Sequence, residues 1–275
     1  MLKQRLITAA ILIPITLLFL FYATPQLFCV VTALIVLAAA WEWASLMQLQ
    51  RFATKSFYLL FLMAAMVGLL FVSIQGTIFV AVCWWLLALF LVIAYPLASS
   101  VWSRSVAVRG LMGMLVLLPC WMAINLIFRS DTGRESLLFL LCLIWGADSA
   151  AYFAGKKWGT TKLIPRVSPG KSVQGLLAAV IFAEVFAIAV AVLSGAPRHL
   201  VVLFPVLCVV TVLFSVLGDL FESMLKRAAN VKDSGNILPG HGGILDRIDS
   251  LTAAAPVYVF GYTLLMIYST SIAGT

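Results

Sequence analysis

Charged residues are scarce in this chain of 275 residues. They make up only 10% of the sequence, whereas 64% of its residues are hydrophobic. An ordinary soluble domain carries about 25% charged residues, and it cannot hide this much apolar surface in one fold surrounded by water. Several apolar stretches approach or exceed the roughly 20 residues that a helix needs to cross a bilayer. The composition therefore excludes an ordinary soluble domain and predicts a polytopic membrane protein.

Clusters of cysteine and histidine are also absent from the sequence. The chain has two histidines, and each of its five cysteines stands alone in an apolar run, with no CxxC pair. We interpret the cysteines as packing residues, not as metal ligands or disulfide partners. The net charge of +8 does not indicate nucleic-acid binding, because most basic residues lie in loops between apolar runs and no nucleic-acid-binding pattern is present.

The apolar runs predict an all-α fold with about nine transmembrane helices. The eighth predicted span continues past Asp219 and leaves the membrane towards residue 230. We find no soluble domain or convincing repeat and treat residues 1–275 as a single membrane-embedded domain. The predicted spans are residues 6–22, 27–46, 56–72, 78–97, 110–128, 136–155, 173–193, 200–230 and 251–268.

The distribution of basic residues predicts how these helices are oriented. With a cytoplasmic N-terminus, fifteen of the 18 lysines and arginines fall on the inner side and three on the outer side. This bias follows the positive-inside rule, and a shift of the count by one span would remove it. It places two polar segments, residues 145–173 and 215–250, on the same cytoplasmic side, where we expect them to form one catalytic region.

Two acidic residues lie at the ends of predicted spans. A carboxylate such as Asp148 is costly at a membrane boundary unless it is paired or bound, which makes it a candidate functional residue. The ordinary alternative is a capping or snorkelling aspartate. For Glu42 we favour the interpretation that its side chain reaches the lipid headgroup layer, with a place in a site as the alternative.

Polar chemistry is concentrated in residues 219–249. This segment holds five of the ten acidic residues, four basic residues, four glycines and one of the two histidines. If its first part is helical, Asp219, Ser223 and Lys226 lie on one face, because they are spaced i, i+4 and i+7. A segment of this kind is often only a solvated loop, but the density of opposite charges beside apolar helices favours a site.

The second part of this segment predicts a phosphate and metal site. Asp246 and Asp249 are three residues apart, so a helix beginning near Ile244 would place both carboxylates on one side. The glycine-rich turn before them, including Gly242 and Gly243, suits close backbone approach to an anion. The two helices would each contribute carboxylates, and the basic pair Lys226 and Arg227 and the glycine-rich turn lie between them. Such an arrangement suits a divalent metal ion that binds substrate phosphates.

These motifs together resemble the signature of the CDP-diacylglycerol synthases, also called phosphatidate cytidylyltransferases. The resemblance covers every polar position of the signature, and the segments 145–148 and 168–171 are similar to further shared features of that family. The signature positions are Ser223, Lys226, Arg227, Lys232, Asp233, Pro239, Gly240, His241, Gly242, Gly243, Asp246, Arg247 and Asp249.

The resemblance implies a reaction of CTP with phosphatidic acid, a membrane lipid, that gives CDP-diacylglycerol and pyrophosphate in phospholipid biosynthesis. It implies a bacterial-type inner membrane location with the active site facing the cytoplasm, and a homodimer is an expectation of the resemblance alone. We expect Asp219 and Asp246 to hold Mg²⁺, with Asp249 as a ligand or an orienting neighbour, and a second cation as an open alternative. The candidate catalytic residues are Asp219, Asp246, Lys226 and Asp249. The candidate substrate contacts are Ser223, Arg227, Lys171, Ser172, His241, Gly242, Gly243, Asp148 and Arg247.

Two other functions fit parts of the sequence. A CTP-dependent lipid kinase would use similar residues but would transfer the γ-phosphate and release CDP. A cation-coupled transporter would also need carboxylates at membrane depth, although its sites usually lie near the midplane and here the acids gather at one face. The product separates cytidylyl transfer, which releases pyrophosphate, from the kinase reaction, which releases CDP. Transport without consumption of CTP would identify a transporter.

Overall fold

The chain folds into a bundle of long helices with one small hairpin. A computed structural model describes residues 13–97, 99–237 and 242–273. In this part of the chain, eight helices are long and apolar enough to cross a membrane, and a shorter apolar helix covers Ile13–Tyr22. The predicted all-α membrane fold is therefore confirmed, whereas the number of spans and the side of the N-terminus stay predictions.

Most helices follow the predicted apolar runs. The clearest difference is the last helix, which begins at Leu245, six residues before the predicted span, and continues without a break through both aspartates that follow. The helices are α2 (Pro25–Leu46), α3 (Phe52–Gly68), α4 (Ile74–Ile93), α5 (Ser99–Trp102), α6 (Val106–Phe128), α7 (Gly133–Trp158), α8 (Val173–Leu193), α9 (Arg198–Ala228) and α10 (Leu245–Ala273), and a 3-10 turn, η1 (Leu69–Phe71), extends α3.

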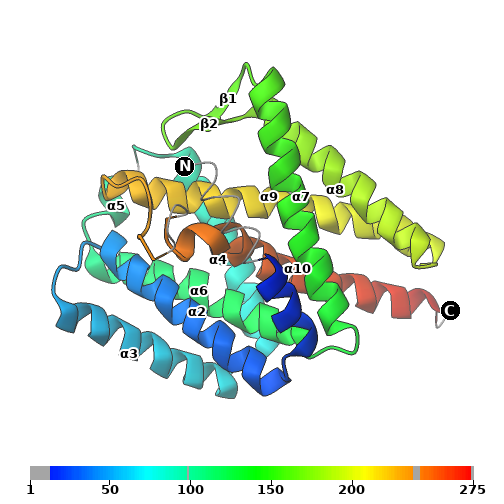
Figure 1. Cartoon of the computed structure of the whole chain (residues 1–275), viewed down its shortest axis with the longest axis horizontal. Helices are drawn as coiled ribbons and strands as arrows, with labels where there is room; N and C mark the ends of the chain where they lie inside the picture. Colours follow the sequence, from blue (N-terminus) through cyan, green and yellow to red (C-terminus); the bar gives the residue numbers. More distant parts are fainter. Residues whose placement is uncertain (1–12, 98, 238–241, 274–275) are drawn as a thin grey trace.

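A two-stranded antiparallel hairpin lies between α7 and α8. Its strands are β1 (Lys162–Ile164) and β2 (Ser168–Ser172), with an irregularity between the paired positions. Figure 1 shows the hairpin at the upper end of α7 and α8, beside the end of α9. The fully buried side chain of Val167 at its tip belongs to the main hydrophobic core, so the hairpin is fixed against the helices.

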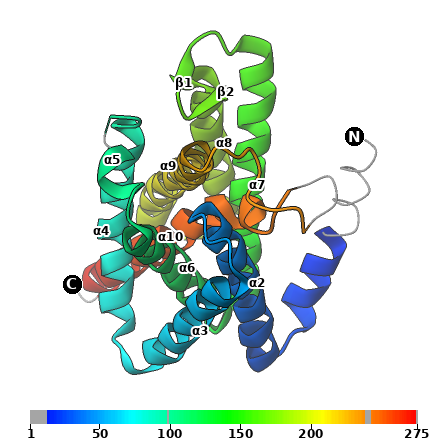
Figure 2. The same cartoon turned by 90° about the vertical axis from the view of Figure 1, so that its left-hand side faces the viewer.

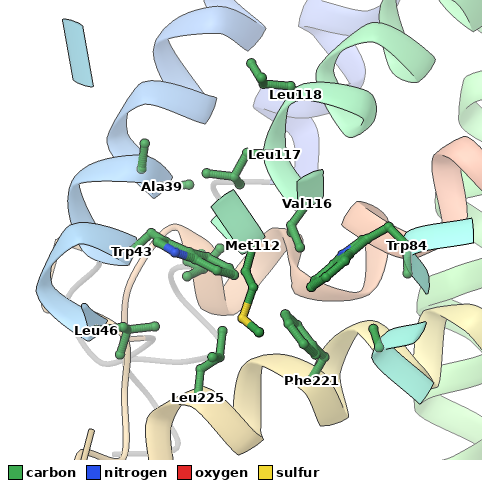
Figure 3. Close-up of a cluster of buried hydrophobic side chains, with 14 of the residues drawn as sticks. Ala39, Trp43, Leu46, Trp84, Met112, Val116, Leu117, Leu118, Phe221 and Leu225 are labelled. Atoms are coloured by element: carbon green, nitrogen blue, oxygen red, sulfur yellow. The ribbon is translucent and has the colours of Figure 1, made fainter. Parts of the chain in front are cut away.

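The main core lies where α2, α4, α6 and α9 meet. Figure 3 shows Trp43, Trp84, Met112 and Phe221 pointing toward one another from these four helices. The ring of Phe221 meets that of Trp84 edge-on, with 5.7 Å between the ring centroids. Glu42 lies beside this core with only 2% of its surface exposed. The favoured interpretation of Glu42 as a headgroup contact is therefore wrong.

The helices α9 and α10 run side by side through the centre of the molecule (Figures 1 and 2). Gly218 permits their close approach, because a side chain there would collide with the carbonyl oxygen of Asp249 and would press on Ala253. Asp219 follows Gly218 directly in α9, so the same contact sets the distance between Asp219 and the part of α10 that contains Asp249.

The helices α7 and α8 form a second close pair. Their packing fixes the position of Ser172, the residue before α8. Gly175 approaches the carbonyl oxygen of Ala151 too closely for a side chain to fit comfortably. Ser172 is the N-cap of α8, and its buried Oγ accepts a hydrogen bond from the N–H of Gly175 at 3.1 Å. This cap fixes where α8 begins, and it thereby positions Lys171 next to α9.

We predict that Gly218→Ala destabilises the protein by about 1–3 kcal/mol, the usual cost of adding a methyl group to a tightly packed contact. The measurement is the free energy of unfolding in detergent. Gly68→Ala is the matched control, because a Cβ at Gly68 meets nothing within 4 Å. Equal stabilities of the two variants would contradict the close contact between α9 and α10.

Candidate functional site

An ammonium group between two carboxylates forms the centre of the polar region. Lys226 Nζ in α9 lies 2.7 Å from Glu222 Oε2, one turn earlier in the same helix. It also lies 2.6 Å from Asp246 Oδ1 at the start of α10. Only 12% of the lysine side chain and 3% of the glutamate side chain are exposed. The three charges therefore join the two helices at a place shielded from water.

Asp246 has hydrogen-bond partners on both carboxylate oxygens. Its Oδ1 accepts from Lys226, and its Oδ2 accepts from the N–H and the Oγ of Ser234, both at 2.9 Å, and from the N–H of Gly243 at 2.8 Å. The bond to Gly243, three residues earlier, resembles the half of a capping box in which an acidic residue reaches back to the helix start. Asp246 therefore joins α9, α10 and the loop between them.

Asp219 is the next acidic residue along α9, and its contacts differ from those of Asp246. Lys171 Nζ lies 2.7 Å from its Oδ2, and the Oγ of Ser223 donates to its Oδ1 at 3.2 Å. About a third of the Asp219 side chain and a quarter of the Lys171 side chain are exposed. This ion pair joins the end of the hairpin to α9 and brings together the two predicted polar segments, 145–173 and 215–250.

Asp249 and Asp148 complete this acidic region. Asp249 lies within Coulombic range of Asp219 and Lys171, and its Oδ1 accepts a hydrogen bond from the N–H of Ser250 at 2.7 Å. Asp148 in α7 is exposed and interacts electrostatically with Lys171, Asp219 and Arg247. Four segments of the chain, α7, the hairpin, α9 and α10, thus place charged groups in one region.

The loop from α9 to α10 turns back sharply. Asn230 has a φ of +57°, and the N–H of Val231 donates to the carbonyl of Lys226, which is the Schellman arrangement that ends many helices. Gly242 has a φ of +79°, a conformation that favours glycine. Gly243 gives its N–H to Asp246, so this group already has a partner within the protein. His241 lies outside the described residues.

The remaining predicted contacts have different surroundings. The side chains of Arg227 and Arg247 are exposed, and Arg227 Nε donates to the carbonyl of Val167 in the hairpin at 3.3 Å. The Oγ of Ser172 is used for the cap of α8, which gives this residue a structural role. Lys171 and Arg247 therefore interact with acidic side chains of this region, whereas Arg227 contacts the hairpin.

The sequence analysis did not single out Glu222. Its spacing of four residues from Lys226 was the available signal, because side chains at i and i+4 lie on the same helical face. Pairs with this spacing are usually solvated surface pairs. The partner that makes this pair a buried one, Asp246, is twenty residues further along the chain.

The donor set fits a magnesium ion at two of the three predicted carboxylates. Among the described residues, no three His, Cys, Asp or Glu side chains lie close enough together to hold a metal ion by themselves. Mg²⁺ commonly uses one or two carboxylates together with the phosphates of a substrate. Asp219 and Asp249 suit this arrangement, whereas the oxygens of Asp246 are engaged by four protein donors.

Comparisons with a family model and with individual relatives indicate the same protein family. The model of the cytidylyltransferase family matches residues 3–265. A phosphatidate cytidylyltransferase of Pseudomonas aeruginosa is 40% identical over 265 residues, which is 94% of this chain and 96% of the relative. One of Haemophilus influenzae is 39% identical, with 95% and 99% covered. One of Bacillus subtilis is 44% identical over 137 residues, about half of each chain.

We predict that Lys226→Met lowers the free energy of unfolding by about 3–5 kcal/mol, because it leaves two buried carboxylates without their shared cation. Adding Glu222→Gln should recover part of this loss, since one of the two uncompensated charges is then removed. The measurement is unfolding in detergent followed by circular dichroism.

Lys162→Met is the matched control for this prediction. Lys162 is exposed on the hairpin, and its replacement should change the stability by less than about 0.5 kcal/mol. A double variant that is less stable than Lys226→Met would show that Glu222 contributes something other than unpaired charge, and would contradict the prediction.

Proposed function

The chain belongs to the cytidylyltransferase family, and from this premise we propose that it transfers the cytidylyl group of CTP to phosphatidic acid. The products are CDP-diacylglycerol and pyrophosphate, and the protein is an integral membrane enzyme of phospholipid biosynthesis. The two full-length relatives support this function, since both carry the name phosphatidate cytidylyltransferase.

One observation carries the proposal for where the reaction occurs. The ion pair between Lys171 and Asp219 joins the hairpin to α9, beside the acidic face that α10 presents with Asp249. This region has cations and carboxylates that are only partly engaged by other protein groups. Two anionic substrates need both kinds of group, cations to hold their phosphates and carboxylates to hold a metal ion between them.

The cations beside this region would bind phosphate groups. Arg227 and Arg247 are exposed, and a guanidinium group matches the geometry of a phosphate with two parallel hydrogen bonds. Lys171 is half-buried and bonded to Asp219, so an incoming phosphate can share its ammonium group. Lys226 is held between Glu222 and Asp246, and its main role is to fix the two helices.

Asp219 and Asp249 would hold Mg²⁺ together with substrate phosphates. When bound, Mg²⁺ offsets the negative charge that builds on the phosphate oxygens during transfer. Asp246 acts beside them by positioning Lys226 and the start of α10. This assignment is narrower than the sequence-based one, because the hydrogen bonds of Asp246 leave it the least available of the three carboxylates.

The chemistry needs little from the protein beyond positioning and charge. An oxygen of the lipid phosphate forms a bond to the α-phosphorus of CTP, and the bond from that phosphorus to the bridging oxygen of pyrophosphate breaks. The attacking phosphate is already an anion, so no strong general base is required. Lys171 and the arginines would bring the two anions together, and their positive charge would favour the departure of pyrophosphate.

The site faces the cytoplasm in this proposal, with the protein in the bacterial inner membrane. The excess of basic residues on one side of the spans supports this orientation, and the bacterial relatives support the membrane. CTP would then reach the polar region from the water, and the lipid would reach it from the adjoining leaflet.

We predict that the purified protein, given Mg²⁺, phosphatidic acid and CTP labelled at the α-phosphate, transfers label into the lipid and releases pyrophosphate. Asp219→Asn should abolish the transfer, because it weakens both the metal site and the ion pair with Lys171. The measurement is the label in the lipid fraction together with the pyrophosphate released. Asp131→Asn is the matched control, since Asp131 is exposed between α6 and α7, at the other end of α7.

Two other results would contradict this function. Release of CDP with no α-label in the lipid would identify a lipid kinase. No consumption of CTP with any lipid, together with ion-dependent uptake into sealed vesicles, would identify a transporter.

We predict that Asp249→Asn raises the Mg²⁺ concentration needed for half-maximal activity by at least about 10-fold, the lower end of what the loss of a supporting metal-site group costs. Titration of Mg²⁺ at saturating CTP measures this. If the requirement of Asp249→Asn equals that of wild type, Asp249 is not part of the metal site.

A further inference from the structure

Glu42 is a buried carboxylate that the proposed reaction does not use. It belongs to α2, far in sequence from the residues of the polar region, and 2% of its surface is exposed. A buried carboxylate is unfavourable unless several donors satisfy it. The partners of Glu42 therefore indicate what its position accomplishes.

Among the described residues, the hydrogen-bond donors to Glu42 come from the loop before α10 and from the start of that helix. Its Oε1 accepts from the N–H of Ile244 at 3.0 Å, and its Oε2 accepts from the N–H of Leu245 at 2.8 Å. The Oγ of Ser234 lies 3.0 Å from the same Oε2. A side chain about 200 residues away in sequence thus provides the cap for α10, and its negative charge suits the positive end of that helix.

The loop is built closely around this carboxylate. A Cβ at Gly235 or at Gly243 would collide with the carboxylate of Glu42. Both glycines therefore permit a contact that any other residue would prevent. The loop on either side of residues 238–241 is held against the same two oxygen atoms.

Ser234 connects Glu42 to the polar region. Its Oγ lies between Glu42 Oε2 and Asp246 Oδ2, at 3.0 and 2.9 Å, and it has one hydrogen to share between them. Asp246 in turn bonds to Lys226 at 2.6 Å. A continuous path of hydrogen bonds therefore runs from α2 through the loop to the lysine that joins α9 and α10.

We propose that Glu42 is a positioning residue for the transfer reaction, a role that rests on the proposed function. It holds the start of α10 and the loop, so that Asp246 and Lys226 keep their places and Asp249, one turn further along α10, faces Asp219. Glu42 touches neither substrate nor metal and acts through the backbone groups that it caps.

The test is Glu42→Gln in the full-length protein, compared with Glu135→Gln. Glutamine keeps the shape of glutamate but replaces one acceptor oxygen with an NH₂ group, which cannot accept a hydrogen bond, so the N–H of either Ile244 or Leu245 loses its acceptor. We expect kcat per folded molecule to fall about 100-fold, the cost of a small displacement of catalytic groups, with KM for CTP near the wild-type value. Glu135 is exposed in the first turn of α7, and its variant should retain wild-type kcat.

Hydrogen–deuterium exchange measures the same role without any substrate. The amides of residues 242–250 should exchange faster in Glu42→Gln than in wild type, whereas those of α8 should be unchanged. If Glu42→Gln does not fold, Ser234→Ala provides the second test, because it removes only the bridging hydroxyl. It should lower kcat in the same direction by a smaller factor.

The outcomes separate the positioning role from the proposed function. Faster exchange in residues 242–250 with a reduced kcat supports the role of Glu42. Unchanged exchange, or faster exchange with wild-type kcat per folded molecule, overturns it. If the wild-type protein itself shows no cytidylyl transfer, the proposed function fails, and the positioning role, which rests on that function, falls with it.

Discussion

The ammonium group of Lys226 lies between carboxylates of two different helices, and the polar region depends on this arrangement. Glu222 is one turn away in α9, whereas Asp246 belongs to α10 and reaches Lys226 from the other side. Each of these buried charges would be unfavourable alone. The three are stable only together, and for that reason α9 and α10 have one favourable position relative to each other, which Gly218 makes sterically possible.

The apolar part of the chain imposes a second constraint. Helices whose outer surfaces suit lipid leave little polar surface, so charged groups gather where helices end and loops return. The Schellman turn at Asn230 reverses the chain after α9, and the cap from Glu42 starts α10. The hairpin after α7 adds Lys171 from a third direction. The polar region thus combines the turn after α9 and the start of α10 with charged side chains from α7, α9 and the hairpin.

Much of the fold could be predicted from the sequence, because apolar runs of sufficient length have few alternatives to membrane helices. The predicted span 173–193 has the bounds of α8. α10 begins six residues before the predicted span, but its start at Leu245 agrees with the helix beginning near Ile244 that would place Asp246 and Asp249 on one side. What local pattern could not give were the long-range contacts. The burial of Glu42 depends on backbone N–H groups about 200 residues away in sequence. The position of the hairpin depends on the packing of Val167 into the main core.

The number of donors around each carboxylate explains how similar residues come to have different roles. Glu42 and Asp246 accept hydrogen bonds from several protein groups each, and their oxygens are used to hold backbone and lysine in place. Asp219 accepts from one lysine and one hydroxyl, and Asp249 accepts a hydrogen bond from the neighbouring N–H of Ser250. A carboxylate that is already satisfied gains little from a metal ion or a substrate, whereas one with open oxygen atoms gains a great deal. In the proposed function, the well-bonded carboxylates of Glu42 and Asp246 hold the helices and the loop in place, and the less bonded ones of Asp219 and Asp249 bind the metal ion. Sequence motifs do not separate these two uses, because both Asp246 and Asp249 belong to the same signature, and only the donors supplied by the fold distinguish them.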